Sequence, residues 1–365
     1  MKKHFVKLFF FCLIIAIFIS GCTPSARRMA EGVIIEDMLG RKVTVPVEVE
    51  RIVGVRSGAL RQLVYMDAID MIIGIEDGER RGTKPYITAH PQLQNLPVIG
   101  PNMGGDAEML ANAHPDVIFS AYTTIAEADD LQKKTGIPVI ALECPEIATP
   151  ARDSLYASLR LIGKILHKEA RADSLIAYMS GLIQELDLRT SNIGDKERPS
   201  VYVGGVSYSG AKNIASTQPF YPPFIFTNSR NVTSMLNERL VSHVRGTYID
   251  IEQLLLWNPD VIFLDESGIN LVRNDLKQGG ALYRGLKAVQ NNRTYTVMPY
   301  NNYAVNYELV LINSWFVGKV LYPDAFTDID VKAKANEILE MFLGKPIFDE
   351  LVTDNSFRQI NKDEF

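Results

Sequence analysis

Tyrosine, arginine, serine and asparagine side chains gather at the places where the sequence predicts that β-strands end. A tyrosine offers a flat apolar face with a polar tip, and an arginine offers fixed donors for carboxylate, catecholate or oxyanion groups. A bulky, partly anionic metal chelate suits such a lining better than a bare cation does. The predicted ligand-binding residues are Arg56, Ser57, Arg80, Arg81, Tyr122, Ser207, Tyr208, Tyr221, Arg245, Tyr248, Tyr300, Asn301 and Tyr303.

Other kinds of chemistry find little support in the sequence. Residues 205–212 read GVSYSGAK, but the lysine is one position late for a phosphate-binding loop, and Asn213 stands where Ser or Thr would coordinate magnesium. His114 precedes a Pro-Asp turn, His167 lies on a predicted helix, and no His-rich loop exists, so a bare zinc or manganese site is not expected. No Ser-His-Asp arrangement or carboxylate pair stands out, so we predict neither an enzyme nor a resident cofactor.

Short apolar strands that alternate with helices position these residues. The pattern predicts an α/β fold of two lobes, with mainly parallel sheets flanked by helices and joined by one long rigid α-helix. In open sheets of this type, ligands bind outside the carboxyl ends of the strands. Residues 33–46 are expected to form a hairpin, and Ser57 is expected to cap the helix after the first strand. The predicted parts are an N-terminal lobe over 33–149, a helical linker over 150–193 with a spine helix at about 168–191, a C-terminal lobe over 200–350, and a tail over 351–365.

The first residues are typical of an exported lipoprotein. Three lysines precede an apolar run of 12 residues, 8–19, which is shorter than the roughly 20 residues that a membrane-spanning helix needs. The run ends Ile-Ser-Gly-Cys, which resembles the bacterial lipobox. We therefore predict a signal peptide over 1–21, lipid attachment at Cys22 and a tether over 22–32. Loss of the three lysines takes the formal net charge from −5 to −8, so a nucleic-acid partner is not expected. Cys144 is expected to be a small core residue.

One sequence pattern occurs twice. Residues 106–119 and 250–263 are identical at eight of fourteen positions, and each reads as a short helix, a Pro-Asp turn and a buried strand. Asp106 and Asp250 are expected to cap their helices. Glu108 and Glu252 lie in the first helical turn, where the helix dipole favours a negative charge. One copy falls in each lobe, so the lobes are expected to share one plan.

The order and spacing of several motifs resemble a known family. These motifs are Asp37–Pro46, the two repeated blocks, and Leu286–Val289 followed by Arg293–Tyr295. Over roughly residues 33–345 the chain resembles the substrate-binding proteins of ABC importers for iron–siderophore complexes and cobalamin, the class with a rigid helical spine. The resemblance implies a ligand between two α/β lobes, a small closure on binding, and one glutamate per lobe, Glu108 and Glu252, that pairs with permease arginines.

Together these observations predict a carrier outside the cytoplasmic membrane. We expect a lipid-anchored monomer on the outer face of that membrane that captures an iron(III) chelate and delivers it to an ABC permease dimer with its ATPase subunits. Within the same class, a corrinoid or haem carrier and a molybdate- or tungstate-type oxyanion carrier stay open. A metal-cluster enzyme on a nitrogenase-like bilobal fold is disfavoured, because only one cysteine besides Cys22 remains after cleavage.

Overall fold

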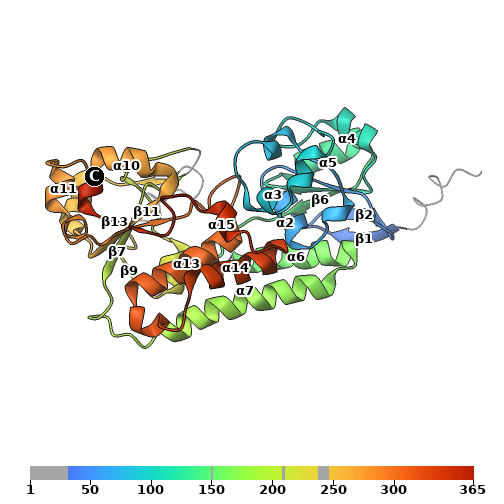
Figure 1. Ribbon diagram of the computed structural model, residues 1–365. Coiled ribbons are helices and arrows are strands. Elements are labelled where there is room, and N and C mark those ends of the chain that lie inside the picture. Colours follow the sequence, from blue (N-terminus) through green and yellow to red (C-terminus); the bar gives the residue numbers. More distant parts are fainter. Residues whose placement is uncertain (1–31, 149–150, 208–209, 237–245) are drawn as a thin grey trace, which may run out of the picture.

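The computed structural model describes residues 32–148, 151–207, 210–236 and 246–365 (Figure 1). Two sheets lie at opposite ends of the molecule, and a layer of long helices runs beneath and between them (Figure 1). The predicted α/β fold of two lobes with a long connecting helix is confirmed. The signal peptide, Cys22 and most of the tether lie outside the described residues. Among the helices described, none is long and apolar enough to cross a membrane.

The N-terminal sheet is wholly parallel, with the strand order β4-β3-β5-β6. Every residue of β3, β5 and β6 is buried, which is the pattern of strands covered on both faces. The strands are β3 (Ile52–Val55), β4 (Ile72–Gly74), β5 (Val117–Ala121) and β6 (Val139–Leu142), and the helices around them are α2 (Ala59–Tyr65), α3 (Pro85–Ala89), α4 (Ala107–Ala113) and α5 (Ile125–Thr135).

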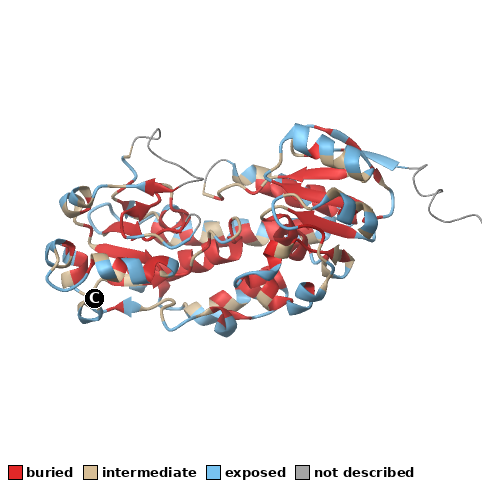
Figure 2. Cartoon of the chain, turned by 90° about the horizontal axis from the view of Figure 1, so that it is seen from above, coloured by how far each residue is buried: buried red, intermediate tan, exposed pale blue. Residues whose placement is uncertain are grey.

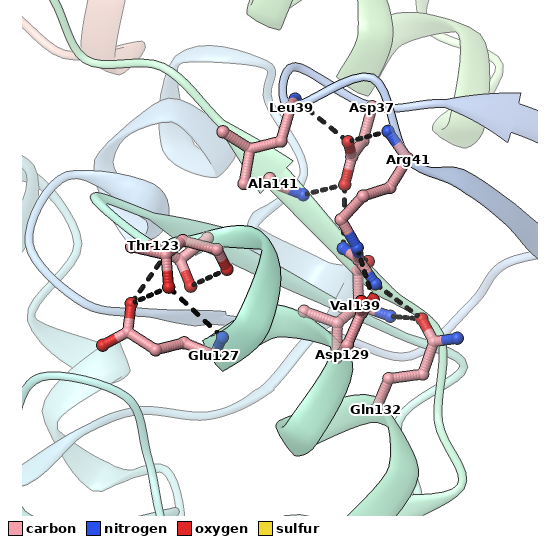
Figure 3. Close-up of polar contacts among 10 residues, drawn as sticks. Asp37, Leu39, Arg41, Thr123, Glu127, Asp129, Gln132, Val139 and Ala141 are labelled. Carbon is pink, nitrogen blue, oxygen red and sulfur yellow. Dashed lines mark hydrogen bonds and ion pairs between the residues drawn. The ribbon is translucent and has the colours of Figure 1, made fainter.

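The predicted hairpin is present as β1 (Gly32–Glu36) and β2 (Lys42–Pro46), and its turn is fastened to this sheet (Figure 3). The Asp37 carboxylate accepts the backbone N–H groups of Leu39 and Arg41 at 3.0 Å and that of Ala141 at 3.1 Å. The Arg41 guanidinium bonds Asp37 at 2.9 Å and Asp129 on α5 at 2.8 Å. Because Asp37 and Arg41 are both buried, these bonds fix the start of the described chain on the lobe.

The C-terminal sheet has the order β13-β12-β11-β7-β9 and is parallel except for β13. A second, two-stranded sheet joins β8 to β10. The strands are β7 (Ser200–Gly204), β8 (Ser216–Thr217), β9 (Arg230–Asn231), β10 (Thr247–Tyr248), β11 (Val261–Asp265), β12 (Thr294–Val297) and β13 (Gln359–Ile360), and the helices are α8 (Pro222–Phe226), α9 (Ile251–Trp257), α10 (Ile269–Asp275), α11 (Ala281–Gly285) and α12 (Lys287–Gln290). A further short helix, α15 (Phe348–Leu351), lies between the lobes and contacts α3 (Figure 1).

Four long helices connect the lobes. They are α6 (Arg152–Leu166), α7 (Glu169–Thr190), α13 (Tyr307–Leu321) and α14 (Val331–Leu343). The 22 residues of α7 give a length of about 33 Å, and its bounds lie within one residue of the predicted spine. The main hydrophobic core runs from the N-terminal sheet through these helices to one face of the C-terminal sheet, and Figure 2 shows the buried segments in both sheets and in the helices between them. A shared core opposes large movements between the lobes.

Two local predictions are wrong. Ser57 does not cap α2, because the residue before the helix is Gly58 with φ 96° and no side-chain cap bond forms there. Asp250 makes no side-chain cap bond, whereas Asp106 accepts from the Met109 N–H at 2.9 Å as expected. Within the predicted tail, 351–365, β13 pairs with β12 of the C-terminal sheet.

Candidate functional site

The carboxylate of Glu76 lies where two loops of the N-terminal lobe meet a segment from the C-terminal lobe. Its side chain is fully buried. One oxygen accepts the N–H groups of Gly104 and Gly105, and the other accepts the N–H of Arg56, all at 2.8 Å. The second oxygen also accepts the hydroxyl of Tyr303 at 3.3 Å. Glu76 therefore holds the backbones of two loops in fixed positions, through three N–H groups, and links them to the opposite lobe.

A buried arginine fastens the same segment of the C-terminal lobe. Arg61, on α2, is 1% exposed. Its guanidinium donates to the carbonyl oxygens of Val305, Asn302 and Tyr303 at 2.9, 3.0 and 2.7 Å. Asn302 in turn donates to the Thr83 carbonyl at 2.8 Å. Residues 302–305 are thus bound directly to the N-terminal lobe, and we call them the bridging segment.

Three of the arginines predicted to bind ligand are held by acceptors of the protein itself. Arg56 donates to the Tyr122 carbonyl at 2.9 Å and pairs with Glu127 at 2.8 Å. Arg80 donates to the Leu96 carbonyl at 2.6 Å, and Arg81 pairs with Asp77 of its own loop. An anion would have to compete with these partners for the three guanidinium groups.

The predicted tyrosines fall into two groups. Tyr122 and Tyr248 are 51% and 52% exposed, and the Tyr122 hydroxyl donates to the Cys144 carbonyl at 2.9 Å. Tyr221 and Tyr300 are 1% and 2% exposed and pack against each other, with ring centroids 5.9 Å apart. Tyr221 and Tyr300 are core residues of the C-terminal lobe, so the structure does not support their prediction as ligand contacts.

The other residues predicted to contact the ligand differ in whether their polar groups already have a partner in the protein. The Ser57 hydroxyl faces the Met103 sulfur at 3.8 Å, and the Ser207 hydroxyl donates to the Gly210 carbonyl at 3.0 Å. Asn301 lies directly before the bridging segment, and its side-chain N–H₂ group is buried without a partner among the described residues. Tyr208 and Arg245 lie outside the described residues.

Burial perturbs several carboxyl groups near these loops. Burial raises the pKa of Glu79 to about 7, although the Tyr86 hydroxyl and Lys84 favour its charged form. Burial likewise raises the pKa of Asp265, at the end of β11, to about 6. The pKa of Tyr303 is raised, first by burial and then by the charges of Glu76 and Glu79. The described part of the chain contains no group of three or more His, Cys, Asp and Glu side chains that could hold a metal ion.

A cavity of about 400 Å³ lies on the N-terminal lobe beside Arg56 and the loop that binds Glu76. Three carboxylates line it against two cations, so its electrostatics disfavour an anion. Its lining comprises Arg56, Met103, Gly104, Gly105, Asp106, Ala107, Ser120, Thr123, Glu127, Asp130, Leu131 and Lys134.

The repeated sequence has the same structural role in both lobes. The side chain of Asp116 accepts the Arg51 N–H at 2.9 Å, and that of Asp260 accepts the Ser200 N–H at 2.7 Å. The backbone N–H of each aspartate returns a bond to the carbonyl of the same residue. Each Pro-Asp turn therefore joins the start of a central strand to its parallel neighbour, which explains much of the identity between the copies.

The two glutamates of the repeat are exposed and form no ion pair with another described residue. Glu108 is the second residue of α4, three residues after Gly105, which binds Glu76, and Glu252 is the second residue of α9, four residues after Tyr248. The hydrogen bonds to neighbouring strands explain why Asp116 and Asp260 occur in both copies. These bonds do not involve Glu108 or Glu252, so the charges of the two glutamates are available to a partner.

Sequence reasoning missed Arg61 and the bridging role of Glu76. The signal for Arg61 was available, because a charged residue stands within the otherwise mostly apolar stretch ALRQLVY, every residue of which is buried. A buried charge needs compensating partners, but the sequence does not identify carbonyl groups more than 240 residues away.

Comparisons with known proteins agree with this architecture. A family model described as periplasmic binding protein matches residues 73–300. The molybdate-binding protein MolA of Haemophilus influenzae is 24% identical over 356 residues, which cover 90% of this chain and 95% of that protein. The structure of MolA bound to molybdate superimposes with a TM-score of 0.66 and 22% identity over 86% of this chain and 98% of that one. The uncharacterized ABC transporter substrate-binding lipoprotein YvrC of Bacillus subtilis is 21% identical over 79% of this chain and 88% of its own length.

Proposed function

This chain belongs to the periplasmic binding protein family, and from that premise we propose that it carries an oxygen-rich anion to an ABC importer. The family consists of transport proteins rather than enzymes, in agreement with the sequence prediction. The cargo that we propose first is a tetrahedral oxyanion of the molybdate kind. The similarity to a molybdate-binding protein over 90% of this chain carries that choice.

One feature of the site supports a small cargo over a bulky one. Arg61, Asn302 and Tyr303 join the lobes directly, and such contacts reduce the depth available between the strand ends. The occupied guanidinium groups of Arg56, Arg80 and Arg81 do not separate the two candidates, because molybdate and an iron(III) chelate would both compete with the partners that these groups already have. An iron(III) chelate is the second candidate, since the exposed rings of Tyr122 and Tyr248 offer flat surfaces of the kind that a chelate contacts.

We further propose that the exposed carboxylates of Glu108 and Glu252 meet arginines of the permease, one from each lobe. Exposed charges at a rim steer association and fix orientation more than they add affinity. A lipid on Cys22 would keep the lobes beside the membrane, because Cys22 lies only ten residues before Gly32, where the described chain begins.

Thermal unfolding of the purified full-length protein tests the cargo. A ligand at a hundred times its Kd stabilises the folded state by about 2.7 kcal/mol, so molybdate and tungstate should raise Tm, and titration calorimetry should give a stoichiometry of one. Sulfate is the matched control for charge and shape. Stabilisation by a ferric chelate, haem or cobalamin, with no effect of molybdate or tungstate, would refute the oxyanion proposal.

A further inference from the structure

We propose that Arg61 is a positioning residue of the cargo site, which acts by fixing the bridging segment, residues 302–305, rather than by touching cargo. This inference rests on the proposed function, and it adds that the oxyanion lies beside that segment. Arg61 is 1% exposed and its two terminal nitrogens are occupied by three carbonyl oxygens. Its effect on a ligand must therefore pass through the segment that it holds.

The geometry of these bonds depends on a guanidinium group. One nitrogen reaches the carbonyl of Val305, and the other reaches those of Asn302 and Tyr303. The central carbon of the group, Cζ, also lies over the Tyr86 ring, 5.0 Å from its centroid. A lysine is a single point charge without a planar fork, so it does not reproduce this set of contacts.

The bridging segment needs such a support because its backbone is unfavourable. Tyr303 and Ala304 are consecutive non-glycine residues with φ 55° and 69°. Residues with a Cβ rarely adopt this left-handed region, and they keep it only when surrounding contacts fix the backbone. Asn306 supplies further support, since its side-chain N–H₂ group donates to the carbonyls of Tyr300 and Asn302 at 2.9 and 3.1 Å.

Two polar groups lie in the segment fixed in this way or directly before it. The Tyr303 hydroxyl reaches Glu76, and the Asn301 side-chain N–H₂ group is buried with no acceptor among the described residues. Buried donors are nearly always hydrogen-bonded in folded proteins. An oxygen of an anionic cargo would supply the acceptor that Asn301 lacks, provided that the segment stays in place.

Hydrogen–deuterium exchange of the cargo-free, full-length protein tests the first half of this proposal. The Asn306 N–H donates to the Tyr300 carbonyl at 2.8 Å and reports on the segment. In Arg61→Lys we expect amides of 301–306 to exchange at least tenfold faster, with no change in β12. Arg189→Lys is the matched control, because Arg189 also makes several bonds and lies over aromatic rings, but far from the junction along α7.

Molybdate titration tests the second half. We expect Arg61→Lys to bind molybdate at least tenfold more weakly and Arg189→Lys to bind it normally. Ala304→Val, a β-branched change at a positive φ, should act like Arg61→Lys and serves if that variant does not fold. In the double variant Arg61→Lys/Tyr303→Phe the losses in affinity should be less than additive, since both act through one segment.

Two results would overturn the proposal. The first is an unchanged rate of amide exchange over 301–306 in both Arg61→Lys and Ala304→Val. The second is faster amide exchange in these variants with an unchanged affinity for molybdate. If the wild-type protein binds no molybdate, the proposed cargo fails, and the same affinity comparison is made with the ferric chelate or corrinoid that does bind. The exchange experiment uses no cargo and therefore separates a failure of the Arg61 proposal from a failure of the cargo assignment.

Discussion

Replacement of Glu76 by glutamine should destabilise the protein more than any exposed glutamate-to-glutamine change. The carboxylate is fully buried and accepts four hydrogen bonds, three of them from backbone N–H groups at 2.8 Å. A glutamine keeps one carbonyl oxygen, which can serve Gly104 and Gly105. Its N–H₂ group then faces the N–H of Arg56, so two donors meet and the Arg56 N–H loses its acceptor.

The expected loss follows from these contacts. An unsatisfied buried donor costs about 1–3 kcal/mol, and the surviving bonds weaken because charge-assisted bonds are roughly twice as strong as neutral ones. The Tyr303 hydroxyl can rotate and accept from the new amide, so that bond survives. We expect a net loss of about 2–4 kcal/mol, which lowers the urea midpoint by about 1 M if the slope is about 3 kcal/mol per M.

Urea unfolding followed by circular dichroism measures this loss. Glu127→Gln is the matched control, because the Glu127 carboxylate also accepts a backbone N–H and pairs with Arg56, but its side chain is 47% exposed. Exposed pairs contribute about 0.2–1 kcal/mol, so the control should lie close to the wild type. Equal midpoints for Glu76→Gln and the wild type would show that Glu76 does not hold these loops together.

Three further predictions follow from the charges and the N-terminus. Burial raises the pKa of Glu79 from 4.5 to about 7, so the folded state keeps a proton that the unfolded chain releases. The free energy of unfolding of the wild type, relative to that of Glu79→Gln, should therefore fall by up to about 3 kcal/mol between pH 4.5 and 7. Urea midpoints of the two proteins that change with pH by the same amount would contradict this. Glu108→Ala with Glu252→Ala should leave cargo affinity and Tm nearly unchanged while uptake by the intact transporter drops sharply, and normal uptake would refute the docking role. Cys22→Ser should release the protein from the membrane fraction or leave it uncleaved, and a mature wild-type N-terminus at any other residue would exclude lipid attachment there.

Local patterns were enough to predict the spine helix and the central strands of both sheets. The spine helix was expected at about 168–191 and spans Glu169–Thr190, because its apolar residues recur at helical spacing and form its buried face. The central strands were predicted because parallel strands covered on both faces are continuous apolar runs, as in β5 and β11. Both signals are carried by residues close together in the chain.

The site was harder to predict because it depends on contacts between distant residues. Arg56 follows a strand as expected, but Glu127, 71 residues away, captures its guanidinium. Tyr221 and Tyr300 have the residue type of a ligand contact, yet they pack in a core that forms only when residues far apart in the chain meet. The repeat gives one success and one failure of sequence reasoning. The sequence showed that the two copies are equivalent parts of the two lobes. It did not show that Asp116 and Asp260 accept hydrogen bonds from the neighbouring strands.

Elemental analysis and native mass spectrometry of the full-length protein, extracted from its own cells, measure the cargo most directly. The proposed function predicts one molybdenum or tungsten atom per chain, bound as an oxyanion and exchangeable with added molybdate. A chain that instead carries an iron chelate, haem or a corrinoid, and that ignores added molybdate, would contradict the oxyanion assignment.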